Sequence, residues 1–145
     1  MEVPVAVVAL AGVVWLAALS AFDIRHRRLP NALTLPGAAA IVIAAVLGSC
    51  GAAAVLGATA LAGLYLVVHL IAPAGMGAGD VKLALGLGAL TGCFGVGAWF
   101  LAAFGAPVLT LLCGLGARLL RRGGPLPHGP SMCAASVIAV LLATL

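Results

Sequence analysis

Asp23 and Asp80 are the two side chains in this sequence best suited to do chemistry. The chain has 3 acidic residues in all, and the third, Glu2, lies at the N-terminus. A carboxylate kept among apolar residues costs free energy, so its presence indicates a function. Two carboxyl groups that approach closely cannot both be ionised, so they share a proton and can supply one base and one acid. Such a pair can activate water against a peptide carbonyl.

Each aspartate taken alone has a simpler interpretation. Asp23 opens the polar stretch DIRHRRLPN, residues 23–31, where it could be a solvated acid beside arginines. Asp80 could cap the N-terminus of a helix, where the helix dipole favours a carboxylate. Two acids offer too few oxygen ligands for Mg²⁺ or Ca²⁺. We therefore expect no metal site, and we expect no cofactor.

A glycine-rich stretch precedes the second aspartate. In GMGAGDVKL, residues 75–83, the glycines Gly75, Gly77 and Gly79 lead to Asp80. Glycine permits close approach of the backbone and positive φ angles, so we expect this loop to bring Asp80 towards Asp23. Lys82 follows closely, and three roles are open for it: lowering the pKa of Asp80, contacting a substrate, or anchoring the topology.

The composition indicates that the solvent of this protein is lipid. Of the 145 residues, 65% are hydrophobic and 7% are charged, whereas soluble domains carry about 25% charged residues. The net charge is +4, but the basic residues are few and lie in short loops. They indicate membrane topology and no nucleic-acid partner. We expect a single integral-membrane domain, residues 1–145.

The elements that must position the aspartates are apolar segments. A membrane-spanning helix needs roughly 20 apolar residues. The sequence predicts an all-α polytopic membrane protein of about six helices, over residues 3–22, 32–47, 52–72, 81–90, 94–117 and 131–145. The fourth segment is too short to cross alone. We therefore expect the glycine-rich loop to dip into the membrane ahead of it, beside a cavity.

The basic residues orient these segments. All 7 Lys and Arg residues fall on one side of a six-span arrangement. The positive-inside rule then predicts both termini outside and both aspartates at the cytoplasmic side. We interpret the first group of arginines as anchors to lipid headgroups and to the topology: Arg25, Arg27 and Arg28.

Three motifs together resemble the type IV prepilin peptidases, a family of membrane aspartic proteases with a GxGD signature. DIRHRRLPN at 23–31 is similar to the family's first aspartate motif, and GMGAGDVKL at 75–83 is similar to its second. LPHGP at 126–130 is similar to a third motif ahead of the last helix. The three occur in order, each on a predicted cytoplasmic loop.

The resemblance implies an aspartic endopeptidase in the prokaryotic cytoplasmic membrane. Its substrates would be prepilins or pilin-like precursors, which carry a basic leader before an apolar helix and are cut at the cytoplasmic face. Asp23 and Asp80 match the catalytic pair of the family. The remaining motif residues are expected to shape the loops or contact the substrate: Pro30, Asn31, Pro127, Gly129 and Pro130.

This sequence departs from the larger family members. They carry a cytoplasmic insert with paired C-x-x-C zinc cysteines and an N-methylating activity, and this sequence has no C-x-x-C pair. It resembles the short forms that serve tight-adherence (Flp) pili or archaeal preflagellins, so no N-methyltransferase activity is expected. His128 stands where an aromatic or aliphatic residue is expected, with little expected effect on catalysis and some on substrate fit.

Other interpretations stay open at this point. A small proton-coupled transporter also uses broken helices and intramembrane acids, although here the acids lie at the ends of their helices. A non-catalytic membrane subunit, in which the carboxylates only cap helices, is the third. Cys50 and Cys93 fall on the same predicted outer side, where a disulfide would be compatible with the oxidising space.

Overall fold

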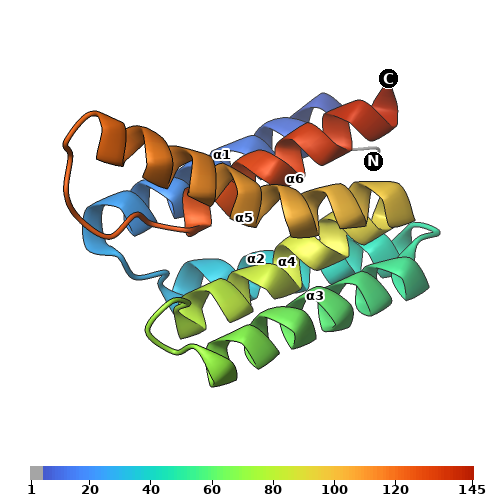
Figure 1. Cartoon of the computed structure of the whole chain (residues 1–145). Helices are drawn as coiled ribbons and strands as arrows, with labels where there is room; N and C mark the ends of the chain where they lie inside the picture. The colour runs from blue at the N-terminus through green and yellow to red at the C-terminus, as the bar shows by residue number, and fades with distance from the viewer. Residues whose placement is uncertain (1–4) are drawn as a thin grey trace.

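The computed structural model describes residues 5–145 and is all-helical in that range, as the sequence predicts. The chain consists of helices that are joined by short loops (Figure 1). Their bounds are as follows: α1 Val5–His26, α2 Asn31–Leu47, α3 Gly51–Ile71, α4 Ala78–Cys93, α5 Val96–Leu119 and α6 Gly129–Thr144.

Three of these helices are long and apolar enough to cross a membrane. They correspond to Val7–His26, Gly51–Ile71 and Val96–Leu119, while α2 and α6 are shorter apolar helices. These properties are those of a membrane protein. α4 is short, as expected, with 16 residues, a length of about 24 Å at 1.5 Å per residue. However, α6 is equally short, with 16 residues. The number of crossings, the dipping loop and the outside position of the termini remain predictions.

Several helix ends differ from the predicted bounds, and three of these differences concern the motif residues. α1 continues past Asp23 to His26, because no helix-breaking residue intervenes, and ends where Arg27 takes a positive φ of 50°. The first aspartate therefore belongs to the last turn of a helix and not to a loop. α4 begins at Ala78, ahead of the second aspartate, and α6 begins at Gly129, before the predicted start at 131.

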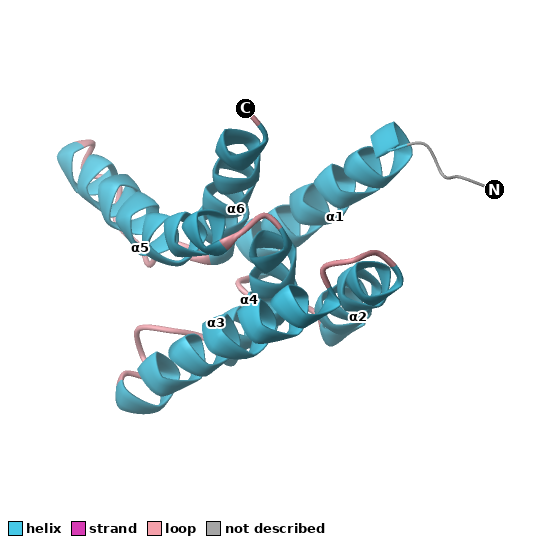
Figure 2. Cartoon of the chain, turned by 90° about the vertical axis from the view of Figure 1, so that its right-hand side faces the viewer, coloured by secondary structure: helices cyan, strands magenta, loops and turns pink. Residues whose placement is uncertain are grey.

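The helices form two groups. α4 packs mainly against α3 and α2, whereas α6 packs mainly against α5 and α1. Seen along the bundle, α4 lies at the centre, with α2 and α3 on one side and α1 and α6 on the other (Figure 2). The central helix is buried over most of its length, including Leu83, Leu87 and Thr91. Asp80 belongs to the first group and Asp23 belongs to the second.

Small residues let α3 and α4 approach until their backbones touch. A Cβ at Gly88 would collide with the backbone of Gly57, and a Cβ at Gly92 would collide with the carbonyl of Ala53. The indole N–H of Trp99 in α5 donates a hydrogen bond to the carbonyl oxygen of Gly57, at 3.0 Å. The small residues of α3 and α4 thus serve close helix packing.

The polar loops gather at one end of the bundle. The connections α1–α2, α3–α4 and α5–α6 lie together at the left of Figure 1, and the C-terminus lies at the other end. The far end also carries Cys50 and Cys93, which lie close together as free thiols, with Sγ of Cys93 3.7 Å from the carbonyl oxygen of Cys50. Functional side chains from distant parts of the chain therefore meet at the end that carries the polar loops.

Candidate active site

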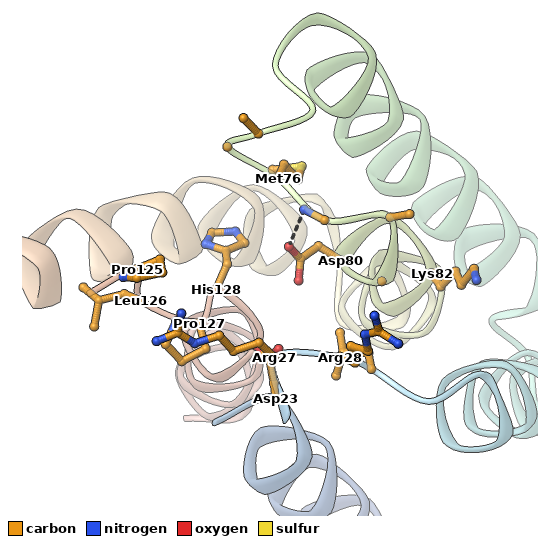
Figure 3. A pocket seen from close by; sticks show the side chains of 16 residues that line it. Asp23, Arg27, Arg28, Met76, Asp80, Lys82, Pro125, Leu126, Pro127 and His128 are labelled. Atoms are coloured by element: carbon orange, nitrogen blue, oxygen red, sulfur yellow. Dashed lines mark hydrogen bonds between the residues drawn. The ribbon is translucent and has the colours of Figure 1, made fainter. Parts of the chain in front are cut away.

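A pocket of about 420 Å³ opens at this end of the bundle and is lined by both aspartates. The side chains of Asp23, Asp80 and His128 surround the same opening (Figure 3). The walls come from the end of α1, the loop before α4 and the loop before α6. The arrangement brings together the two acids that the sequence singled out.

Asp23 lies in the last turn of α1 and is only 7% exposed. Its Oδ2 atom accepts a 2.9 Å hydrogen bond from the backbone N–H of Gly129, the first residue of α6. A Cβ at position 129 would lie 2.5 Å from the same oxygen. Glycine is therefore required at this position by the close approach of the carboxylate.

Asp80 lies in the first turn of α4 and is 8% exposed. Its Oδ2 atom accepts a 3.3 Å hydrogen bond from the backbone N–H of Gly77, and its own N–H donates to the carbonyl of Gly77 at 3.1 Å. Asp80 is thus the third residue of the helix and not its N-cap. The dipole at this helix end favours the ionised carboxylate, so the simple capping role and a chemical role are compatible.

The prediction of positive φ angles in the glycine-rich loop is wrong. Among the described residues, the glycines with positive φ are Gly95 and Gly124, both elsewhere. Gly79 has a different role, because a Cβ there would lie 3.2 Å from Cβ of Leu29. Gly75 and Gly77 have room for a Cβ, whose nearest neighbours would lie 3.6 and 3.7 Å away. Close approach at one position, and not left-handed backbone, explains the need for glycine.

Lys82 joins two helices. Its Nζ atom donates a 2.7 Å hydrogen bond to Oδ1 of Asn31, the first residue of α2. Lys82 lines the pocket, whereas Asn31 and Pro30 do not. Pro30 precedes α2 with a φ of −69° and accepts hydrogen bonds at its carbonyl from the start of that helix.

The third motif contributes to the pocket from the other side. Pro127 and His128 line it, and Gly129 contacts Asp23 directly. Pro130 lies within the first turn of α6, where its missing N–H costs no hydrogen bond. These residues thus lie at the start of α6 or directly before it.

Sequence reasoning missed Tyr65 and His69, which both lie on α3. The hydroxyl of Tyr65 lies 3.2 Å from Nε2 of His128. Nδ1 of His69 lies 2.6 Å from the carbonyl oxygen of Met76 and so fastens the loop before Asp80. The signal was available, because positions 65 and 69 lie on one face of a helix and Tyr65 is the chain's 1 tyrosine.

Side chains of both charges line the pocket. Arg27, Arg28 and Lys82 line it together with the two aspartates. The hydrogen bonds that Asp23 and Asp80 accept come from backbone N–H groups, and both residues line the pocket. Burial lowers the pKa of His128 below its ordinary 6.5, against the opposing effect of the Asp23 charge. Two acids facing one open volume can hold a water molecule between a base and an acid.

Comparison with known proteins identifies the family of this chain. Residues 10–144 match the type IV leader peptidase family. The chain is 36% identical over 135 residues to a prepilin leader peptidase/N-methyltransferase of Dichelobacter nodosus, an alignment that covers 87% of this chain. The chain spans 45% of the length of that relative. No solved structure matches. Since the family match extends over nearly the whole chain and includes both aspartates, this protein belongs to the type IV leader peptidase family.

Proposed function

We propose that this protein is an aspartic endopeptidase that removes the basic leader from type IV pilin-like precursors. The observation that carries the proposal is the presence of Asp23 and Asp80 in one pocket, although they come from different helix groups. Two of the 3 acidic residues of the chain are thereby gathered at one site. Family membership and the prepilin peptidase name of the relative support the same activity.

The proposed reaction uses both carboxyl groups and one water molecule. The ionised carboxylate takes a proton from the water as the water oxygen bonds to the scissile carbonyl carbon. The carboxylic acid of the other aspartate protonates the carbonyl oxygen, which gives a tetrahedral intermediate. This intermediate returns one hydroxyl proton to the ionised aspartate, the protonated aspartate gives its proton to the leaving nitrogen, and the C–N bond breaks. The pair ends with one shared proton, as it began.

The position of the pocket suits a precursor made of a basic leader and an apolar helix. In the proposed complex, the apolar helix lies in the membrane beside the bundle. The leader junction then reaches the end where the polar loops gather. We propose that this end faces the cytoplasm of a prokaryotic cell, because all the basic residues of the chain flank it.

Coexpression with a pilin-like precursor tests the proposal. Leader removal is followed by a mobility shift of the precursor. Asp23→Asn and Asp80→Asn should each abolish cleavage while leaving the protein in the membrane fraction. Arg118→Gln, at the end of α5 and away from the pocket, is the matched control and should cleave normally. Cleavage at a normal rate by either aspartate variant would contradict the proposal.

A further inference from the structure

His128 contacts two helices through its two ring nitrogens. Its Nε2 atom lies 3.2 Å from the hydroxyl oxygen of Tyr65 in α3. Its Nδ1 atom lies 2.6 Å from Oγ1 of Thr110 in α5. His128 itself stands directly before α6. One imidazole therefore ties the start of α6 to α3 and to α5.

The hydrogen-bond donors and acceptors of Thr110, His128 and Tyr65 can be assigned consistently. Thr110 donates its hydroxyl hydrogen to the carbonyl of Ala106, at 3.1 Å. Its oxygen can then accept from Nδ1–H of His128, while Nε2 accepts from the hydroxyl of Tyr65. This arrangement requires a neutral imidazole, and burial favours the neutral form. Every polar hydrogen in the chain of contacts is then used within the protein.

The peptide group after His128 carries the hydrogen bond to Asp23. The N–H of Gly129 belongs to the planar unit that also contains the carbonyl of His128, and it donates to Oδ2 of Asp23 at 2.9 Å. The side chain of His128, the N-cap residue of α6, makes no capping hydrogen bond to the helix itself. The imidazole contacts therefore fix the first turn of α6, and with it the donor to Asp23.

We propose that His128 is a positioning residue of the peptidase site, which holds the peptide between positions 128 and 129 against the carboxylate of Asp23. This inference rests on the proposed function, because it assigns the aspartate a role in the reaction. His128 acts through Gly129 and Asp23, and not on the scissile bond. A position error of about 1 Å in a catalytic group can cost 100-fold in rate, so the loss should fall on kcat.

The test uses the purified full-length protein in lipid nanodiscs with a precursor that carries a basic leader and an apolar helix. His128→Leu removes both imidazole contacts, Tyr65→Phe removes the one at Nε2, and His128→Gln restores hydrogen-bonding groups. The control is His26→Gln, at the exposed end of α1. kcat and KM are measured separately, and amide hydrogen exchange of residues 127–132 is measured without substrate.

The turnover of His128→Leu should fall by roughly one to two orders of magnitude, with KM within about twofold of the wild-type value. Tyr65→Phe should lower kcat less, His128→Gln should recover part of the loss, and the double variant His128→Leu/Tyr65→Phe should be no worse than His128→Leu. Exchange at the start of α6 should be faster in His128→Leu than in wild type.

Two outcomes would overturn the inference. Unchanged kcat in His128→Leu, or a rise in KM alone, would make the imidazole a substrate contact or a filler of space. Unchanged exchange at the start of α6 would show that the imidazole does not hold this turn, whatever the activity. A wild-type protein that cleaves no precursor, yet shows the faster exchange in His128→Leu, would instead reject the proposed function and leave the positioning role in place.

Discussion

Gly129 and Asp23, which lie 106 residues apart in the chain, are joined by a 2.9 Å hydrogen bond from backbone N–H to carboxylate. The contact connects the first turn of α6 to the last turn of α1. It leaves no space for a side chain at position 129. The first aspartate is thus oriented by the backbone of a distant helix, and its orientation depends on the residues that hold that helix start.

The glycines near the two aspartates should differ sharply in their tolerance of alanine. Gly129→Ala places a methyl group against Oδ2 of Asp23, so we expect precursor cleavage to fall by about 100-fold or more. Gly77→Ala is its control, because the backbone there is extended, with φ −77° and ψ 151°, and the new methyl group would have ordinary contacts. Cleavage rates normalised to membrane content measure the difference. Equal losses in both variants would contradict the steric argument.

His69 should control the mobility of the loop before Asp80. His69→Leu removes the 2.6 Å contact with the carbonyl of Met76, a loss of about 0.5–1.5 kcal/mol in local stability. We expect faster amide hydrogen exchange in residues 73–80 and a lower cleavage rate. His26→Leu changes a histidine whose ring neighbour is Phe22 and should leave exchange in 73–80 unaltered. If His69→Leu leaves amide hydrogen exchange in residues 73–80 unchanged, His69 does not hold this loop.

The stability of the protein should depend on pH through His128. Burial lowers the pKa of this imidazole below 6.5, so the unfolded chain takes up a proton at a higher pH than the folded one. The stabilisation is therefore complete above about pH 6.5 and is lost as the pH falls towards the folded-state pKa. The groups that face the ring are Asp23, Tyr65 and Thr110.

The measurement compares thermal unfolding of wild type and His128→Gln between pH 8 and pH 5, at one scan rate. We expect the difference in Tm between the two proteins to move against wild type as the pH falls. A difference that stays constant across this range would show that His128 has the same pKa in both states.

Arg27 and Arg28 should weaken the binding of a basic leader, because both line the pocket. Neutralising either one, as Arg27→Gln or Arg28→Gln, should lower KM roughly two- to fivefold, with a larger effect at low ionic strength. Arg122→Gln, outside the pocket lining, is the matched control for net charge. A rise in KM would indicate that these side chains contact carbonyl or carboxylate groups of the substrate instead.

Much of the fold could be predicted because apolar segments and basic loops are strong signals. The helices, the shortness of the fourth one and the gathering of the polar loops follow from segment lengths and from the positions of Arg and Lys. The pairing of Asp23 with Asp80 followed from their rarity and from the motif resemblance. In contrast, the end of α1 at His26 was missed, since charged residues near a span continue a helix as readily as they end it.

The details of the site could not be predicted for reasons of geometry. Glycine permits both positive φ and close approach, and the sequence does not say which one Gly79 serves; the structure shows close approach to Leu29. The contact between Tyr65 and His128 joins residues 63 positions apart. It depends on where the loop before α6 lies relative to α3, and no local pattern encodes that placement.

The division of the helices into two groups has a consequence for how the two aspartates are held relative to each other. Asp80 is carried by α4, whose backbone is locked against α3 at Gly57 and Gly88, whereas Asp23 is carried by α1 and clasped by α6. The relative position of the two acids is therefore set by how the two helix groups pack against each other, and the contacts of His128 with Tyr65 and of Trp99 with Gly57 join these groups.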